Sequence, residues 1–263
     1  MLDEHISPKD FGVMHYIDIL NLHIPSYTFF MILAFIVAAI CYKLTAVKMD
    51  KEKNSYRTLI IIFALLGGIL GAKLPIIIFN YKLLFQYPEN ISLLLSGKTI
   101  VGGLLGGFLG IFLLKKRLNI KMKTGNDIAA PAALGMAIGR LGCFFAGCCY
   151  GIESPKLLGV NFGDGIYRYP TQLYELAFDL GLFLCFLYLK KRTELKPGIL
   201  FRYLIISYLS FRFFLEFIRE SDRIILGISY YQMICLASVI FICRKNIKNI
   251  FKKKASVDYQ AKN

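Results

Sequence analysis

The sequence predicts an all-α, polytopic membrane protein with about seven transmembrane helices. Of its 263 residues, 56% are hydrophobic and only 19% are charged, which leaves too little polar surface to coat a water-soluble globule. The apolar residues gather in stretches of about 17–21 residues, the helix length that a hydrocarbon core of roughly 30 Å requires. The 32 Lys and Arg residues fall mostly in short runs between these stretches. The composition also excludes intrinsic disorder and a small disulfide-stapled secreted domain.

The first four predicted helices are separated by loops whose basic content alternates. Tyr27–Leu44 is followed by a loop region with five Lys and Arg residues, and Leu59–Phe79 by one with two. Ile100–Leu114 is again followed by five and Ile128–Phe145 by two. Each helix therefore connects a basic end to a less basic one, as expected when successive helices cross a membrane in opposite directions.

The alternation continues through the last three predicted helices. Leu173–Leu189 leads into a loop with four basic residues, Ile199–Ile218 into one with two, and Ile224–Cys243 into a tail with seven. One side of the membrane thus collects 21 Lys and Arg residues and the other side 7. Because basic loops favour the cytoplasmic face, we expect the N-terminus outside and the C-terminus in the cytoplasm.

The domain organisation follows from these helices. We expect one seven-helix membrane domain at residues 1–246, and a basic cytoplasmic tail at 247–263 that either binds anionic lipid or is only solvated. The acidic segment before Tyr27 lacks the basic n-region of a signal peptide, so we expect the first helix to be retained. The net charge of +15 does not indicate nucleic acid as a partner, because the basic runs alternate with spans and never build one face.

Glycines recur at four-residue spacing in three of the predicted helices. Small residues at this spacing let helix backbones approach closely in lipid, so packing is the simplest interpretation. Gly102 and Gly103 allow a second one, because they begin a helix directly after Lys98 and Thr99. Free backbone N–H groups beside a lysine suit a phosphate. The spaced glycines are Gly67/Gly71, Gly102/Gly106/Gly110, Gly103/Gly107 and Gly135/Gly139.

Ionisable side chains inside predicted spans point to a functional site, because each costs several kcal/mol to place in lipid. Most of those found here fall toward the outer half of the membrane in the predicted topology. They are Lys73, Arg140, Glu175, Arg212, Glu216 and Arg219, with Asp127 and Asp179 nearer helix ends.

The sixth predicted helix carries the most informative pattern. Tyr208, Arg212, Glu216 and Arg219 are spaced i, i+4, i+8 and i+11, which puts them on one side of the helix. One interpretation is an ion-pair network that holds the bundle together. The other is an anion site, in which two arginines bind a phosphate bidentately and Glu216 orients one of them. A cationic cavity that opens outward suits a phospholipid headgroup.

Three of the seven cysteines, Cys143, Cys148 and Cys149, fall within seven residues at the predicted outer membrane edge. Thiol chemistry, a disulfide from Cys143 to one of the other two, and a metal site are all open interpretations. Zinc would need a fourth ligand from elsewhere, since no histidine lies nearby in the sequence. Arg140 would favour a neighbouring thiolate.

These motifs resemble those of the prolipoprotein diacylglyceryl transferase family along nearly the whole chain. The matching motifs are the segment Asp127–Gly142, which ends in Gly-Arg-Leu-Gly, Tyr-Pro-Thr-Gln-Leu-Tyr-Glu at 169–175 and Phe-Arg-x-x-x-Glu-x-x-Arg-Glu at 211–220. The resemblance implies transfer of a diacylglyceryl group from phosphatidylglycerol to the cysteine thiol of a lipoprotein precursor at the outer leaflet, with glycerol phosphate leaving. It implies Arg140 and Arg212 as phosphate binders, Glu216 as the residue that orients Arg212, and Tyr208 as a cavity hydroxyl.

The chain differs from the family pattern at three positions. Val101 stands where the family has a histidine, Cys143 where it has an asparagine, and Cys148 where it has an acidic residue. Because the histidine is assigned to deprotonation, the base is open here: Glu216, Tyr208 or a water. Two alternative functions remain. One is a divergent transferase of another lipid or acceptor that uses Cys143, Cys148 and Cys149, and the other is a non-catalytic phospholipid-binding or transport protein.

We therefore expect a multi-pass transferase of the bacterial inner membrane. Its expected partners are phosphatidylglycerol, a prolipoprotein with a lipobox cysteine, and membrane lipids, and we expect neither a cofactor nor a metal. The expected catalytic residues are Arg140, Arg212, Glu216, Tyr208, Cys143 and Cys148. The expected substrate-binding residues are Arg140, Gly102, Gly103, Arg212, Arg219 and Lys73.

Overall fold

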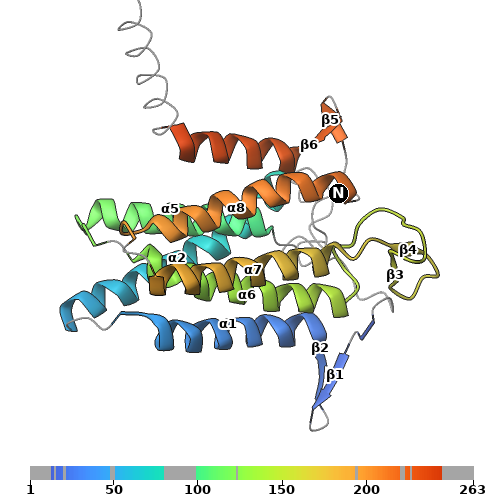
Figure 1. Cartoon of the computed structure of the whole chain (residues 1–263), viewed down its shortest axis with the longest axis horizontal. Helices are drawn as coiled ribbons and strands as arrows, with labels where there is room; N and C mark the ends of the chain where they lie inside the picture. The colour runs from blue at the N-terminus through green and yellow to red at the C-terminus, as the bar shows by residue number, and fades with distance from the viewer. Residues whose placement is uncertain are drawn as a thin grey trace, which may run out of the picture.

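The computed structural model is a bundle of roughly parallel and antiparallel helices with short β-hairpins at one end (Figure 1). It describes residues 13–14, 16–19, 22–47, 51–79, 99–122, 124–192, 195–219, 223–225 and 227–244. The predicted tail at 247–263 and the lysine at position 98 lie outside the described residues. The helices are α1 (Ser26–Thr45), α2 (Lys51–Phe79), α5 (Ile100–Arg117), α6 (Gly125–Phe145), α7 (Thr171–Arg192), α8 (Ile199–Leu215) with the 3₁₀ helix η2 (Glu216–Ile218), and a last helix, Tyr230–Arg244.

Six of the seven predicted segments overlap helices of the structure, although α2 begins eight residues before the predicted Leu59, and the seventh is wrong at its start. Instead of a helix from Ile224, the strands β5 (Arg223–Ile225) and β6 (Ile228–Ser229) form an antiparallel hairpin. Gly227 lies at its turn with a φ of +73°, a conformation that glycine adopts without steric cost. A short apolar run of isoleucines fits a strand or a helix equally well, which is why the sequence pattern missed the hairpin.

The helices present apolar side chains outward. Four of them have the length and composition to cross a membrane: Ser26–Thr45, Asn54–Pro75, Gly125–Phe145 and Thr171–Arg192. Large side chains such as Ile36, Ile69 and Leu184 are more than half exposed on their outer faces. Apolar surface of this extent is stable against lipid rather than water. The chain is a mostly helical, multi-pass membrane protein.

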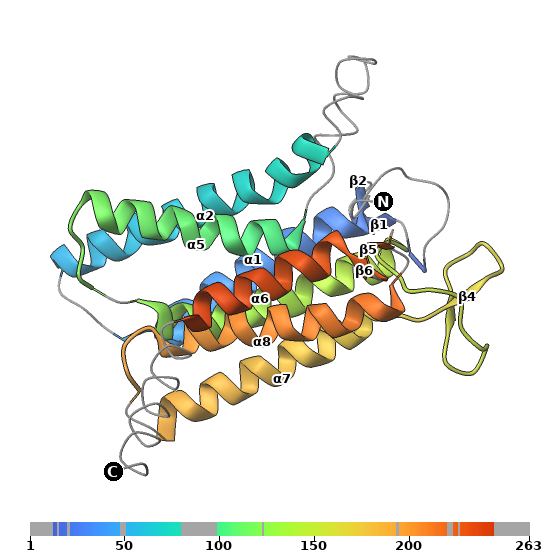
Figure 2. The ribbon, with the colours of Figure 1, turned by 90° about the horizontal axis from the view of Figure 1, so that it is seen from above.

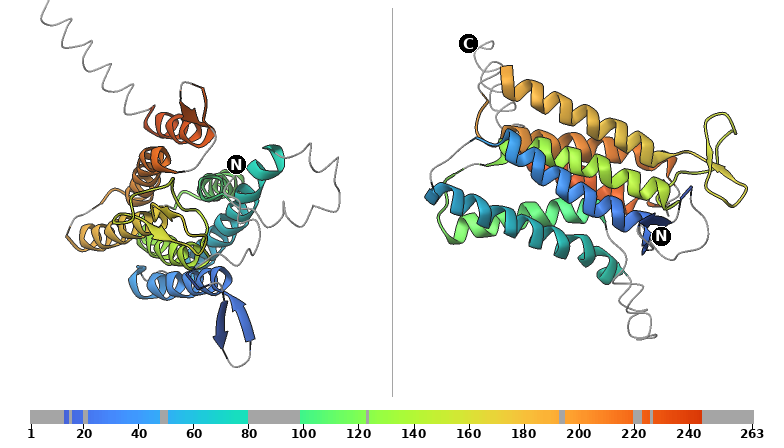
Figure 3. Two further views of the ribbon diagram at one scale, coloured as in Figure 1. Left: turned by 90° about the vertical axis from the view of Figure 1, so that its right-hand side faces the viewer. Right: turned by 90° about the horizontal axis from the view of Figure 1, so that it is seen from below.

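Two helix pairs and a central helix organise the bundle. α2 packs along α5, α1 packs along α6, and α6 also contacts α7 and α8. Figure 2 places α2 and α5 together along one flank and α7 along the opposite flank, and both views in Figure 3 agree. α6 therefore lies where it can share buried groups with both α7 and α8.

Glycines make the contact between α2 and α5 unusually close. A Cβ added to Gly106 would lie 2.3 Å from the carbonyl oxygen of Gly67, and one added to Gly102 would lie 2.3 Å from that of Gly71. No real Cβ tolerates such distances, so the two backbones touch through their glycines. The packing interpretation of the four-residue spacing is confirmed for this pair.

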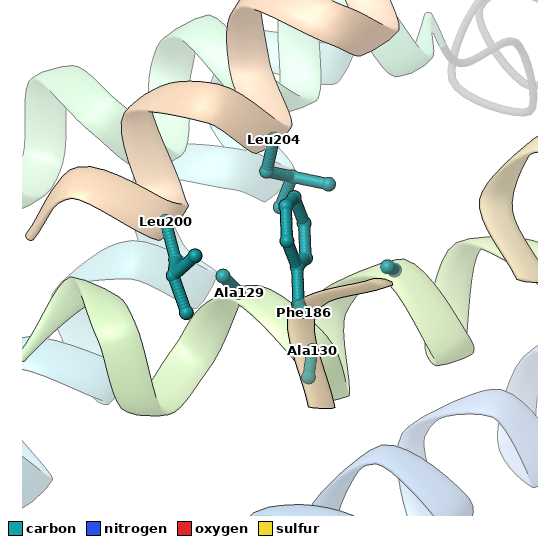
Figure 4. Close-up of a cluster of buried hydrophobic side chains, with 6 residues drawn as sticks. Ala129, Ala130, Phe186, Leu200 and Leu204 are labelled. Carbon is teal, nitrogen blue, oxygen red and sulfur yellow. The ribbon is translucent and has the colours of Figure 1, made fainter. Parts of the chain in front are cut away.

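The apolar core between α6, α7 and α8 lies toward the end away from the hairpins. The small face of α6 lets the larger side chains of α7 and α8 fill the space over it (Figure 4). This packing fixes the relative positions of the three helices that carry the buried charges. The residues of this core are Ala129, Ala130, Ala133, Phe186, Leu200 and Leu204.

One of the predicted in-span charges, Asp127, lies at this same end of the bundle. Asp127 at the start of α6 accepts hydrogen bonds from Arg57 of α2 (3.2 Å) and Lys190 of α7 (2.5 Å). Lys190 also donates to the carbonyl oxygen of Thr45 at the end of α1 (2.7 Å). The carboxylate of Asp127 thus joins three helices, and Lys190 extends the link to a fourth, which indicates a structural role for Asp127.

Three antiparallel hairpins lie together at the other end of the bundle (Figures 1 and 2). Besides β5–β6, they are β1 (Tyr16–Ile19) with β2 (Leu22–Pro25), and β3 (Val160–Asn161) with β4 (Tyr167–Arg168). α6 and α8 end here and α7 begins here. Side chains near these three helix ends therefore lie at the same height along the bundle.

Candidate functional site

Buried charged side chains gather at the hairpin end of the bundle. Arg140 lies five residues before the end of α6, Glu175 four residues after the start of α7, and Arg212 three residues before the end of α8. At about 1.5 Å per residue, each lies roughly 5–8 Å inside its helix end. All three are at most 2% exposed. The antiparallel arrangement of α6, α7 and α8 is what brings them together.

Glu175 is the centre of the cluster. Its Oε2 accepts hydrogen bonds from Arg140 Nη2 and from the hydroxyl of Tyr208 (3.2 Å), and that hydroxyl in turn accepts from Arg140 (3.3 Å). Its Oε1 faces Nη1 of Arg212 at 3.7 Å and Nη1 of Arg219 at 3.6 Å. These last two distances are those of ion pairs rather than hydrogen bonds. One carboxylate therefore pairs with three guanidinium groups.

A second carboxylate orients Arg212. Glu216, one turn farther along the chain, pairs with Arg212 Nη2 through Oε2 at 3.0 Å. Its other oxygen accepts from the Ser229 hydroxyl (3.3 Å), and the side chain of Gln232 accepts from the Ser229 backbone N–H (2.9 Å). Ser229 belongs to β6, so the hairpin that interrupts the predicted seventh span supports the orientation of Arg212.

Among the ion pairs that the structure describes in this cluster, arginines outnumber carboxylates. Among its described ion-paired members, the three guanidinium groups of Arg140, Arg212 and Arg219 face the two carboxylates of Glu175 and Glu216. All five side chains are at most 8% exposed. Three guanidinium groups offer up to fifteen N–H donors, more than two carboxylates can accept. Such an excess of donors is typical of a site that binds an anion, and anion binding here stays a prediction.

The structure brings together five predicted site residues and adds one that the prediction left out. Tyr208, Arg212, Glu216 and Arg219 do lie on one side, and they meet Arg140 from α6. The addition is Glu175. The sequence already marked it as an ionisable residue within a span and as the last residue of the motif at 169–175. Its central position results from the packing of three helices, so it could not be predicted from the sequence of any one of them.

The cysteine trio, Cys143, Cys148 and Cys149, lies beside this cluster. The three Sγ atoms are within 4.8 Å of one another, and none of the three cysteines forms a disulfide in the structure. Arg140 Nη1 lies 4.0 Å from the Sγ of Cys143. One arginine thus contacts both Glu175 and the trio, which joins the two predicted clusters into one site.

Buried polar side chains hold the turn that carries the trio. Gln172 donates to the carbonyl of Cys148 (2.6 Å) and Thr171 to that of Cys149 (2.7 Å), and both donors are fully buried at the start of α7. Cys149 has a φ of +64° and Gly147 one of +66°, which folds the chain back sharply after α6. This left-handed conformation is uncommon for a residue other than glycine.

The loop after the trio is held by its own contacts. Arg168 donates to Asp164 (2.5 Å) and lies over the ring of Tyr150 at 4.6 Å, and that ring stacks on Phe162. Partial burial opposes ionisation of Asp164, but the hydrogen bonds from Arg168 and from the Ile166 N–H outweigh it and lower the pKa of this carboxyl below its ordinary value. Asp164 is therefore a stable ionic partner for Arg168 at neutral pH.

Comparison with known proteins identifies the family of the chain. Residues 14–244 match the family model described as prolipoprotein diacylglyceryl transferase. The chain belongs to the prolipoprotein diacylglyceryl transferase family. Among its relatives are proteins named phosphatidylglycerol–prolipoprotein diacylglyceryl transferase. One from Clostridium tetani is 36% identical, over 62% of this chain and 68% of the relative. One from Geobacter sulfurreducens is 33% identical, over 83% of this chain and 84% of the relative.

A further relative is the protein from Clostridium perfringens named phosphatidylglycerol–prolipoprotein diacylglyceryl transferase 2. It is 32% identical, over 78% of this chain and 83% of its own length. The matches extend over most of the helical bundle described above. They do not favour either alternative function, a transferase of another lipid or a non-catalytic binding or transport protein.

At the start of α5, the structure shows how one N–H group of the predicted phosphate cradle is used. Gly102 faces Gly71 of α2, and the N–H of Gly103 donates to the carbonyl oxygen of Thr99 (2.9 Å). The N–H of Gly103 is therefore used within the helix and is not available as predicted. Val101 is 4% exposed and packs in an apolar cluster with Ile205 and Leu209 of α8. Lys73 lies on α2, and its role in binding stays a prediction.

Proposed function

We propose that this chain transfers a diacylglyceryl group from phosphatidylglycerol to the cysteine thiol of a prolipoprotein. The observation that carries the proposal is the convergence of Arg140, Arg212 and Arg219 on Glu175 inside an apolar bundle. A buried excess of guanidinium donors is costly unless an anion completes it. The headgroup phosphate of an anionic lipid is such an anion, and it reaches this depth from within a leaflet.

The proposal includes a membrane topology. All seven helices of the described residues, the shorter α5, α8 and Tyr230–Arg244 among them, cross the membrane, with the N-terminus outside and the C-terminus in the cytoplasm. Two observations support this orientation. The basic ends of α5 and α7, at 115–117 and 190–192, lie opposite the hairpins, and basic ends favour the cytoplasmic face. The arginines then lie at the depth of the outer leaflet of the bacterial inner membrane.

The chemistry assigned to the arginines is stabilisation of a leaving group. Attack of the acceptor sulfur on the glyceryl carbon breaks the bond from that carbon to the phosphate oxygen, and glycerol phosphate leaves with the bonding electron pair. Negative charge grows on the phosphate in this step, and guanidinium groups fixed in a dry site stabilise it more strongly than water does. Arg212, held by Glu216, and Arg140, held by Glu175 and Tyr208, are the residues best fixed for it.

The test is complementation of a bacterial strain depleted of its own diacylglyceryl transferase, together with an assay on a lipobox peptide in phosphatidylglycerol vesicles. We expect the parent chain to support growth and to convert the cysteine peptide, but not a serine peptide, to the lipidated product. Arg212→Ala abolishes both, whereas Arg202→Ala, on the same helix, retains both. Trapped phosphatidylglycerol without lipidated peptide would contradict transfer and favour a binding protein.

A further inference from the structure

We propose that the cysteine trio, Cys143, Cys148 and Cys149, is a site for a zinc ion with one open coordination position, which the thiol of the acceptor cysteine occupies. This inference rests on the proposed transfer function and adds to it the group that activates the acceptor. From the sequence alone we expected no metal. Convergence of the three sulfur atoms in the structure is the reason to change that expectation.

The spacing of the sulfur atoms suits a metal. Zinc–thiolate bonds are about 2.3 Å long, so three sulfurs around one zinc lie roughly 4 Å apart. The Sγ atoms of the trio are already within 4.8 Å of one another. The largest separation therefore exceeds the zinc-bound distance by only about 1 Å. Thiolates are soft ligands, which favour Zn²⁺ over Mg²⁺ or Ca²⁺.

Hydrogen bonds from surrounding residues fix the backbone of the trio, as such bonds do in metal sites. The backbone turn that presents Cys148 and Cys149 is fixed by the buried side chains of Gln172 and Thr171. The N–H of Cys148 donates to the carbonyl oxygen of Cys143 (3.0 Å), which closes the turn onto the end of α6. Such outer contacts orient ligands before the metal arrives.

The trio leaves room for a fourth ligand. Cys143 is buried at 3% exposure, whereas Cys148 and Cys149 are partly exposed. Three protein ligands and one open position are the arrangement of zinc sites that act in catalysis. Among the described residues, no histidine or carboxylate joins the three sulfurs within the same 4.8 Å. A thiol that arrives from outside completes the tetrahedron with a fourth sulfur.

The position of the trio matches the needs of the transfer. Arg140 lies 4.0 Å from Cys143 on one side and contacts Glu175 on the other. A thiol bound at the trio therefore lies next to the guanidinium groups that hold the phosphate. The carboxylates of Glu175 and Glu216 are already paired with arginines, and neither activates the acceptor thiol in this proposal. The zinc ion supplies the activation of the thiol that these carboxylates do not.

The step balances without a redox change. Zinc displaces the thiol proton to solvent, because a coordinated thiol is held as thiolate. The zinc-bound sulfur then forms its bond to the glyceryl carbon, and glycerol phosphate leaves with the electron pair of the broken carbon–oxygen bond. The product is a neutral thioether, a poorer zinc ligand than a thiolate, so it leaves the metal. The three protein thiolates and the zinc ion are unchanged.

The first test measures metal content. We expect the full chain, purified from zinc-supplemented cells without chelator, to hold about one zinc ion per molecule. Cys143→Ser and Cys148→Ser lose it, whereas Cys185→Ser, which removes an exposed cysteine of α7, keeps it. Absence of bound zinc in the parent chain would overturn the proposal, and so would a disulfide within the trio found by mass spectrometry of the unreduced protein.

The second test uses Co²⁺ as a coloured probe for zinc. The cobalt-loaded full chain is placed in phosphatidylcholine nanodiscs, which provide no donor lipid, and its absorption is followed on adding a lipobox peptide. A cysteine peptide changes the cobalt spectrum to that of four sulfur ligands, and the matching serine peptide leaves it unchanged. An identical response to both peptides overturns the proposal, because the acceptor thiol then does not reach the metal.

The third test separates this inference from the proposed function. We expect protein stripped of zinc to lose transfer activity and to regain it with Zn²⁺ but not with Mg²⁺. Asp179→Asn changes a buried carboxyl group one turn beyond Glu175, and we expect this variant to keep transfer activity. If stripped protein or Cys143→Ser transfers like the parent, the zinc site is wrong while the transferase function stands. Loss of transfer in Asp179→Asn alone would assign proton removal to that carboxyl and overturn the zinc mechanism.

Discussion

Arg140 of α6 and Glu175 of α7 form an ion pair in which the arginine is 2% exposed and the glutamate fully buried. Both side chains also contact the hydroxyl of Tyr208 on α8, so three helices meet at this pair. The remaining oxygen of Glu175 faces Arg212 and Arg219. Any change at Glu175 therefore alters both the packing of the bundle and the charge of the site.

Replacing Glu175 by Gln tests this dual role. The substitution keeps the shape but leaves three buried guanidinium groups without their shared charge partner. Breaking a buried ion pair by removing one partner typically costs about 3–5 kcal/mol. We expect Glu175→Gln to unfold at clearly lower temperature in detergent and to lose transfer. Glu153→Gln, at an exposed position of the loop, is the control, and equal unfolding temperatures for the two variants would contradict the central position of Glu175.

Replacing Arg212 by Lys separates charge from geometry. Lysine keeps the positive charge but cannot bind Glu216 and a phosphate with a planar fork. We expect the folded protein to persist while kcat/KM for phosphatidylglycerol falls by about a hundredfold, in line with loss of one donor that stabilises developing charge. Arg202→Lys on the same helix, where the arginine donates to the Ile242 carbonyl oxygen, leaves kcat/KM unchanged. A similar decrease of kcat/KM in both variants would indicate that the structure of α8 is disturbed, rather than that a phosphate ligand is lost.

Much of this arrangement was predictable from the sequence, because a membrane imposes strict rules on charge. Apolar stretches located six helices, and the in-span charges included every member of the arginine cluster. The spacing of Tyr208, Arg212 and Glu216 on one helix predicted their common side correctly. Helical periodicity fixes which residues share a side, so predictions within one helix succeeded.

The features that the sequence did not reveal depend on contacts between helices. Glu175 was visible as an in-span charge, but nothing local indicates that three arginines converge on it. Ser229 was placed inside a predicted helix, whereas it lies in β6 and supports Glu216. The function of Gly102 was ambiguous until α2 was found against α5. In each case the deciding partner lies far away in the sequence.

The carboxylate at the opposite end of the bundle gives a contrasting prediction. Asp127 binds Arg57 and Lys190, and it lies thirteen residues before Arg140 on the same helix, or about 20 Å away at 1.5 Å per residue. We expect Asp127→Asn to lower the free energy of unfolding by about 3 kcal/mol and to leave KM for phosphatidylglycerol unchanged. Equilibrium unfolding in detergent and transfer kinetics on the folded fraction measure the two effects. A changed KM would show that this end of the bundle communicates with the site.

The glycine contact between α2 and α5 gives the last prediction. A methyl group at position 106 would lie 2.3 Å from the carbonyl oxygen of Gly67 and 2.7 Å from the Cα of Gly71. Because these atoms belong to backbone, the two helices must separate to admit it, and overpacking of this kind typically costs about 1–3 kcal/mol. We expect Gly106→Ala to lower the free energy of unfolding by about that amount, measured by equilibrium unfolding in detergent.

Gly181 provides a matched control for that substitution. It lies within α7, and a Cβ built there meets no heavy atom within 4 Å. Since alanine is favoured over glycine inside a helix by about 0.5–1 kcal/mol, Gly181→Ala should unfold at the same or higher temperature than the parent chain. The same chemical change thus has opposite signs at the two positions. Equal stability of Gly106→Ala and Gly181→Ala would mean that the backbones of α2 and α5 are not in contact through their glycines.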